Sequence, residues 1–133
     1  MAERAHGTLR LVMVAAACAM LVGCGGYVGR GTHLYREGRY IESAEVLARY
    51  EGIVEQEPPK RQAQYATYRG LTSLRLGDYA DAHRWMVFAY EVVRRHPTAL
   101  RPEHRRELDR GWWELMSRLP LPPPGGMAPP PAQ

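Results

Sequence analysis

Hydrophobic and small side chains recur at alternating intervals of three and four residues in two stretches of the chain. The first run is Tyr40, Ser43, Leu47, Tyr50 and Val54, and the second is Tyr79, Ala82, Met86, Ala89 and Val93. Such spacing places these side chains on one face of an α-helix. Gly38 and Gly77 precede the runs, where a glycine with positive φ can end an earlier helix. Pro58 and Pro97 mark the ends of the second helices, because proline lacks an N–H donor. The pattern predicts helix, tight turn, helix and proline, twice.

The two stretches belong to one repeated unit. A shift of 39 residues superimposes Arg30 on Arg69, Gly31 on Gly70, Arg36 on Arg75, Gly38 on Gly77, Tyr40 on Tyr79, Val54 on Val93 and Pro58 on Pro97. A fixed period of about 20 to 50 residues is typical of repeat proteins, in which each unit buries its apolar face against the next. We therefore expect two helical hairpins packed side by side.

The second unit resembles a tetratricopeptide repeat. It has Gly70, Leu74, Gly77-Asp78-Tyr79, Ala82, Ala89 and Pro97 in the order of that family. In the family, Gly70 and Ala82 would be the small pair that lets the two helices approach closely, and Gly31 and Ser43 take these places in the first unit. The resemblance implies an all-α fold over residues 27–119, with two tetratricopeptide-like hairpins and a C-terminal capping helix in a short α-solenoid.

The units depart from the family at two points. Their period is 39 residues in place of the usual ~34, which we assign to longer helices around residues 55–64. Arg30 and Arg69 occupy positions that the family usually fills with leucine. A buried arginine needs a partner. These side chains therefore either reach the surface along their aliphatic stems or pair with a carboxylate of a neighbouring helix.

The C-terminal part of the chain changes character after the second unit. The positions that predict a capping helix are Leu108, Trp112, Leu115 and Leu119, and those on its solvated face are Arg105, Arg106, Glu107 and Arg110; Arg110-Gly111 repeats the Arg-Gly pair of both units. Trp112 and Trp113 are either core residues or a binding platform, and helical spacing favours the core. Residues 120–133 contain 7 prolines in 14 residues, which predicts an extended, disordered tail.

The N-terminus has the pattern of an export signal. Arg4 and Arg10 precede an uncharged, mostly apolar run over residues 11–23. This run is shorter than the ~20 residues that span a bilayer, so it predicts a cleaved signal peptide. The run ends in Leu21-Val22-Gly23-Cys24, which resembles the lipobox of bacterial lipoproteins. The alternative is an ordinary secretory signal with an incidental cysteine.

The lipobox resemblance implies a membrane anchor. Residues 1–23 would be the signal peptide, Cys24 the acylated residue, and residues 24–26 a short linker to the helical domain. Two or three acyl chains make a durable anchor where one chain does not. Gly25 follows the cysteine, where an Asp would favour inner-membrane retention. We therefore expect a periplasm-facing protein of the outer membrane, with the inner membrane as the alternative.

Catalytic chemistry has little support in the sequence. Of 133 residues only Cys18 and Cys24 are cysteines, and 18 basic against 14 acidic residues give a net charge of +4. The histidines show no HExxH motif or i, i+4 pair, no serine lies in a nucleophile elbow, and no glycine-rich loop is present. We expect no enzyme activity, no metal, no cofactor and no nucleic-acid partner.

These features together predict an anchored interaction protein. We expect an adaptor or assembly factor of a bacterial envelope complex; the alternative is a structural lipoprotein that self-associates or completes a larger complex, because two repeats are fewer than the three usually needed for stability. The family resemblance places Arg36 and Arg75 on the concave surface, with Leu71 and Leu74 as its apolar floor. Paired guanidinium groups suit an acidic or C-terminal peptide of an envelope protein. The alternative is that both arginines are simply solvated.

Overall fold

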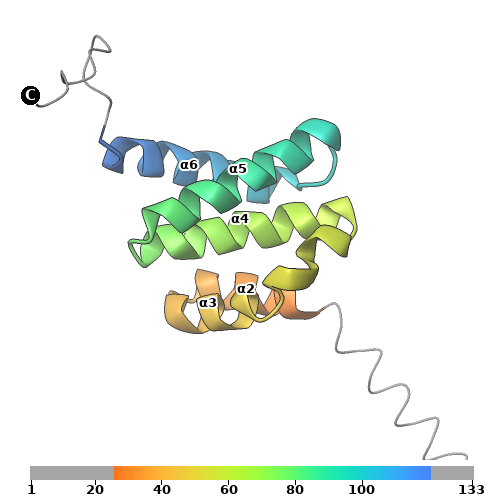
Figure 1. The fold of residues 1–133 in the computed structure, drawn as a ribbon, viewed down its shortest axis with the longest axis horizontal. Coiled ribbons are helices and arrows are strands. Elements are labelled where there is room, and N and C mark those ends of the chain that lie inside the picture. Colours follow the sequence, from red (N-terminus) through yellow and green to blue (C-terminus); the bar gives the residue numbers. More distant parts are fainter. Residues whose placement is uncertain (1–25, 121–133) are drawn as a thin grey trace, which may run out of the picture.

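The computed structural model describes residues 26–120, which form helices and no strand (Figure 1). In chain order the elements are α2 (Gly26–Arg36), α3 (Tyr40–Ala48), the 3-10 helix η1 (Glu51–Gln56), α4 (Pro59–Arg75), α5 (Tyr79–Arg95) and α6 (Pro102–Arg118). The all-α prediction is confirmed. The predicted signal peptide, the lipobox with Cys24, and the tail beyond Pro120 lie outside the described residues.

Two antiparallel hairpins, α2 with α3 and α4 with α5, end their first helices in the same way. Gly38 has φ 77° and Gly77 has φ 80°, the positive values that the sequence predicts. The N–H of the following residue then bonds back to the end of the helix, from Arg39 to the Leu34 carbonyl and from Asp78 to the Ser73 carbonyl, both at 2.9 Å. The two Gly-x-Tyr turns are therefore equivalent in backbone geometry.

Helix α4 lies at the centre and contacts every other helix of the described residues. In Figure 1 the α2–α3 pair lies on one side of α4, and α5 and α6 lie on the other. Tyr68 of α4 contacts Glu107 of α6, and Arg75 contacts Glu114, so residues 39 apart meet and the two helices run parallel. Helices α4 and α6 are therefore neighbours with the same chain direction.

Small residues set the spacing inside each hairpin. A Cβ atom at Gly70 would lie 2.8 Å from Met86 Cγ and 3.2 Å from the Ala82 carbonyl oxygen, so Gly70 and Ala82 face each other as predicted. In the first hairpin, a Cβ at Gly31 would lie 2.6 Å from Leu47 Cδ2. The Ser43 hydroxyl donates to the Gly31 carbonyl at 2.9 Å.

The segment between the hairpins differs from the sequence prediction. A continuous helix through Val54 was expected, but α3 ends at Ala48 and a 3-10 helix follows. Nor do longer helices around residues 55–64 account for the 39-residue period, because a break falls between η1 and α4. Pro58 forces an extended backbone on the residue before it, and Pro59 begins α4, where its missing N–H costs nothing. The step from α4 to α6 is also 39 residues although no 3-10 helix lies within it, so η1 alone does not account for the period.

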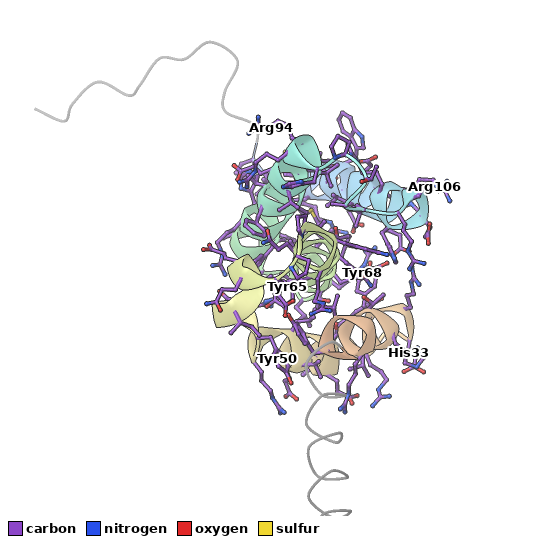
Figure 2. The ribbon with its side chains drawn as sticks, turned by 90° about the vertical axis from the view of Figure 1, so that its right-hand side faces the viewer. His33, Tyr50, Tyr65, Tyr68, Arg94 and Arg106 are labelled. Atoms are coloured by element: carbon purple, nitrogen blue, oxygen red, sulfur yellow. The ribbon has the colours of Figure 1, made fainter. Side chains whose placement is uncertain are left out.

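The core is one continuous cluster rich in aromatic side chains. Its largest fully buried side chains are Tyr65, Tyr68, Leu47, Leu71, Met86, Leu108 and Leu115. Figure 2 shows Tyr65 and Tyr68 inside the molecule, whereas Arg94 and Arg106 project from its surface. The buried Tyr65 hydroxyl donates to the Leu47 carbonyl at 2.7 Å, which satisfies its hydrogen-bonding need.

Candidate protein-binding groove

A groove of about 370 Å³ lies between α2, α4 and α6. It is lined by Tyr35, Arg36, Leu71, Arg75, Glu103, Arg106, Glu107, Arg110 and Gly111. Three of the residues predicted for protein binding, Arg36, Leu71 and Arg75, thus lie at one place. Leu74 is 4% exposed in the core and is not part of this lining. Four arginines against two glutamates make the groove electropositive.

Arg36 does not stand free at this site. Its Nη2 donates to the Tyr68 hydroxyl at 2.8 Å and to Glu107 Oε1 at 2.7 Å. The hydrogen bond to Glu107 raises the pKa of the Arg36 guanidinium. The side chain is still 46% exposed, because its outer edge faces the groove. Arg36 therefore ties α2 to α4 and α6 and also presents charge to the groove.

Beside Arg36, a chain of hydrogen bonds runs through the buried His104. Arg101 Nη2 lies 2.7 Å from His104 Nε2, and since arginine only donates, Nε2 accepts. The proton of the neutral ring is then on Nδ1, which donates to the Tyr68 hydroxyl at 2.7 Å. Arg36 Nη2 also lies 3.3 Å from Nδ1, but its two protons go to Tyr68 and Glu107, so this contact is not a hydrogen bond. Tyr68 in turn donates to Glu107 Oε2 at 2.9 Å. Every polar atom along this path has a partner.

The same surroundings shift the pKa values of two groups in this chain. Burial, then the positive charges of Arg101 and Arg36, lower the pKa of His104, which agrees with the neutral ring that the hydrogen bonds require. Burial, then the hydrogen bond to Glu107, raise the pKa of the Tyr68 hydroxyl. The network is therefore built for a neutral histidine and a protonated tyrosine.

Arg75 occupies the equivalent place in the second hairpin and is also engaged. Its Nη1 donates to Glu114 Oε1 at 2.9 Å, and Arg118 shares the same carboxylate at 3.0 Å. The side chain is 34% exposed. The sequence reasoning missed these carboxylates of α6. The 39-residue register could have indicated them, because Glu114 follows Arg75 by one period, as Glu107 follows Tyr68.

Two further arginines of the groove come from α6. Arg106 and Arg110 are exposed, and no ion pair joins either of them to a carboxylate among residues 26–120. Both had been assigned to the solvated face of the capping helix. That assignment fits their exposure, but Glu107 of the same predicted face turns toward α2 and α4. The unpaired positive charge of the groove therefore lies on its α6 side.

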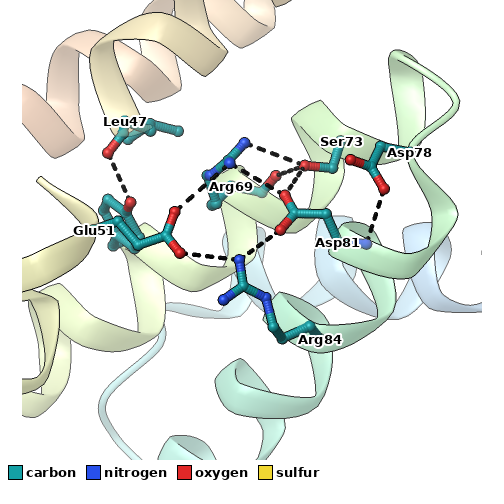
Figure 3. Close-up of polar contacts among 8 residues, drawn as sticks. Leu47, Glu51, Arg69, Ser73, Asp78, Asp81 and Arg84 are labelled. Carbon is teal, nitrogen blue, oxygen red and sulfur yellow. Dashed lines mark hydrogen bonds and ion pairs between the residues drawn. The ribbon is translucent and has the colours of Figure 1, made fainter. Parts of the chain in front are cut away.

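A second polar cluster surrounds Arg69, one of the two unusual arginines of the 39-residue unit (Figure 3). Arg69 is 15% exposed and pairs with Asp81 at 3.2 Å and Glu51 at 3.7 Å. Burial opposes ionisation of Asp81, but hydrogen bonds from Ser73 and Arg84 outweigh it and lower the pKa of this carboxyl. Arg30 is exposed instead. Of the two predicted alternatives, Arg69 therefore pairs with carboxylates of neighbouring helices and Arg30 reaches the surface.

The two neighbouring tryptophans of α6 differ in environment. Trp112 is partly buried against the core, as its spacing predicts, and its ring meets Tyr90 edge-on at a centroid distance of 5.5 Å. Trp113 is 74% exposed, so the core assignment is wrong for this residue. Both rings line a second hollow between α5 and α6.

Other features of the described chain bear on its chemistry. Within residues 26–120, no group of three or more His, Cys, Asp or Glu side chains is arranged to hold a metal ion. None of the described helices combines the length and apolar character that crossing a membrane requires. No protein-family model, no curated protein and no solved structure matches the chain.

Proposed function

We propose that this protein is a lipid-anchored adaptor of the bacterial envelope, in which two tetratricopeptide-like hairpins and α6 present a groove to an acidic or C-terminal peptide segment of a partner protein. Cys24 would hold the protein at the periplasmic side of the outer membrane through its acyl chains. The role would be binding, with no catalysis and no cofactor.

The observation that carries the proposal is the charge of the groove. Arg36 and Arg75 use part of their donors on carboxylates of α6, whereas Arg106 and Arg110 face solvent on the opposite wall. Unpaired guanidinium groups offer paired hydrogen bonds to a carboxylate. Leu71 lies between the walls, but it is 2% exposed and belongs to the core, as Leu74 does. Such a groove fits a segment that carries carboxylates.

The structure also determines which substitution tests the groove best. Reversing the charge of Arg36 or Arg75 would place a glutamate beside Glu107 or Glu114 and loosen α6, so lost binding would not be specific to the groove. The double variant Arg106→Gln with Arg110→Gln, in place of charge reversal, removes exposed charge that is in no ion pair among residues 26–120 and adds no carboxylate beside Glu107 or Glu114. The matched control is Arg49→Gln with Arg95→Gln, since these two arginines are exposed outside the groove and in no ion pair among residues 26–120.

The measurement is crosslinking in membranes followed by recovery of the partner, together with binding of a short glutamate-rich peptide that has a free carboxyl terminus. We expect the Arg106 and Arg110 double variant to lose recovery of the partner and binding of the peptide, and the control variant to keep both activities. Added salt should weaken peptide binding by the parent protein. Equal recovery and equal peptide binding by a folded double variant would rule out this groove. Recovery of only further copies of the chain would favour the self-associating structural lipoprotein.

A further inference from the structure

The hollow between α5 and α6 is larger than the arginine groove, at about 560 Å³, and its floor is aromatic. Tyr90 comes from α5, and Trp112 and Trp113 come from α6. Trp113 follows Leu74 by one 39-residue period, yet Leu74 is 4% exposed in the core and Trp113 is 74% exposed. Apolar surface that gathers at one exposed place marks a site of interaction. The hollow is therefore a candidate binding site of its own.

Two of the three rings are held in place by their neighbours. The Tyr90 hydroxyl donates to Asp109 at 2.7 Å, and Arg105 Nε donates to the same carboxylate at 2.9 Å. The Arg105 guanidinium also lies over the Tyr90 ring, 5.1 Å from its centroid. Tyr90 in turn meets the Trp112 ring edge-on. This floor is formed before a ligand arrives, so binding does not have to order it.

Polar groups without a partner stand around the aromatic floor. Glu91 and Arg94 are exposed on α5 and line the hollow, and neither side chain makes a hydrogen bond or an ion pair within residues 26–120. Both bonds to Asp109 end on Oδ1, which leaves its Oδ2 unpartnered in the same part of the chain. A carboxylate only accepts and a guanidinium only donates. The hollow therefore offers both kinds of polar contact to one ligand.

These groups restrict what the hollow can bind. A proline-rich segment would suit the aromatic rings, but proline has no N–H, so Glu91 would lose water and gain no donor. A lipid surface would bury the same carboxylate without a donor. A helix cannot pack closely, because Asp109 follows by one period Gly70, the residue that lets α5 approach α4. The ligand must have an apolar face and both donors and acceptors at its edge.

We infer that the α5–α6 hollow binds a β-1,4-linked strand of N-acetylated amino sugars. The ring of such a sugar presents C–H bonds on its faces, which are attracted to the negative face of an indole such as Trp113. Its acetamido group has an N–H for Glu91 and a carbonyl oxygen for Arg94. From Val87 to Arg94 the hollow extends about 10 Å along α5, longer than one sugar ring.

An aromatic floor with a few polar groups at its edge is the usual composition of a small-ligand site. The hollow and the arginine groove share no lining residue. The inference therefore does not rest on the proposed adaptor function.

The probe is chitotriose, the β-1,4-linked trimer of N-acetylglucosamine, added to the full chain in micelles of a detergent that has no sugar headgroup. The indole N–H resonances report Trp85, Trp112 and Trp113 separately. We expect chitotriose to shift the resonances of Trp112 and Trp113. Trp85 is 6% exposed in the core, so its resonance should stay in place and show that the fold is kept.

Two variants with matched controls test the assigned contacts. Trp113→Ala should weaken chitotriose binding about tenfold, and its control, Ile41→Ala, removes a side chain that is 67% exposed on α3 and should leave binding unchanged. Arg94→Gln should weaken binding several-fold, whereas Arg95→Gln, at an exposed arginine outside the hollow, should not. Cellotriose has the same linkage without acetamido groups and should bind more weakly than chitotriose.

Trp112 and Trp113 resonances that do not respond to chitotriose would overturn the inference. Equal binding by the parent and a folded Trp113→Ala protein would also overturn it, because the aromatic floor would not be the contact. Equal binding of cellotriose and chitotriose would overturn the choice of N-acetylated sugars. A response to decaproline in place of chitotriose would assign the hollow to a proline-rich segment and overturn the glycan.

Discussion

Gly70 is the closest point between the two helices of the second hairpin, and Gly70→Ala sets two known effects against each other. Alanine is favoured over glycine inside a helix by about 1 kcal/mol. The new Cβ, however, would lie 2.8 Å from Met86 Cγ and 3.2 Å from both the Ala82 oxygen and the Met86 nitrogen. Backbone atoms cannot rotate away, so α5 must move. Overpacking of this kind costs about 1 to 3 kcal/mol, so we expect a net loss of about 1 kcal/mol.

The chain provides glycines at which the same change has a different expected result. Gly29 lies inside α2, and a Cβ there meets nothing within 4 Å, so Gly29→Ala should gain stability from propensity alone. At Gly111 the Cβ would lie 2.3 Å from Leu71 Cδ2 and 3.1 Å from Met86 Cε, which are the ends of flexible side chains. The stability of Gly111→Ala should therefore lie between those of Gly29→Ala and Gly70→Ala. Gly70→Leu should be less stable than Gly70→Ala.

Urea unfolding followed by far-ultraviolet circular dichroism measures this order as free energies of unfolding. The expected gap of about 2 kcal/mol between Gly29→Ala and Gly70→Ala corresponds to roughly 8 to 16 °C in melting temperature for a domain of this size. The difference between the two variants matters more than either value, because the gain in helix propensity cancels. A Gly70→Ala protein as stable as Gly29→Ala would refute the close approach of α4 and α5.

Two further predictions concern other parts of the chain. Cys24→Ser should leave an uncleaved precursor or a soluble protein in place of one that partitions into detergent, and intact-mass measurement of the parent should show a lipid-modified chain beginning at residue 24; a different first residue or a missing lipid mass would contradict the anchor. Because the pKa of His104 is lowered from 6.5 in the folded state, the unfolded chain takes up the proton first, so stability should fall as pH drops below about 6.5. The fall should be smaller in His104→Gln, and equal slopes for the two proteins between pH 7 and 5 would show that His104 does not titrate in this way.

Local features of the fold could be predicted from the sequence because they depend on neighbouring residues. Gly38 and Gly77 adopt positive φ, and the residues of both helical runs point inward, since spacing and glycine conformation act within a few residues. The continuous helix expected through Val54 is wrong, although the burial that it predicts for this residue is right. Val54 is 2% exposed, and α3 has already ended at Ala48. Apolar spacing therefore predicts which residue is buried here, but not which type of helix carries it.

Ion pairs between helices depend on which charged residues of the neighbouring helix lie close by. These pairs could not be predicted from the sequence. Arg30 and Arg69 occupy the same position of the repeat, yet only Arg69 finds carboxylates, because Asp81 and Glu51 lie beside it. Likewise, Arg36 and Arg75 were assigned to a peptide, while Glu107 and Glu114 of α6 already use part of their donors. A charged residue in a repeat can therefore be assigned a role only after its neighbours along the stack are known.

Helix α6 departs from the 39-residue register at the position that corresponds to Gly70. Arg110-Gly111 repeats the Arg-Gly pair of both hairpins, but Gly111 faces back toward Leu71 and Met86. The residue that follows Gly70 by one period is Asp109, whose carboxylate is held by Tyr90 and Arg105. A helix could not approach α6 here as closely as α5 approaches α4, because the glycine that permits that approach is replaced by a fixed, larger side chain.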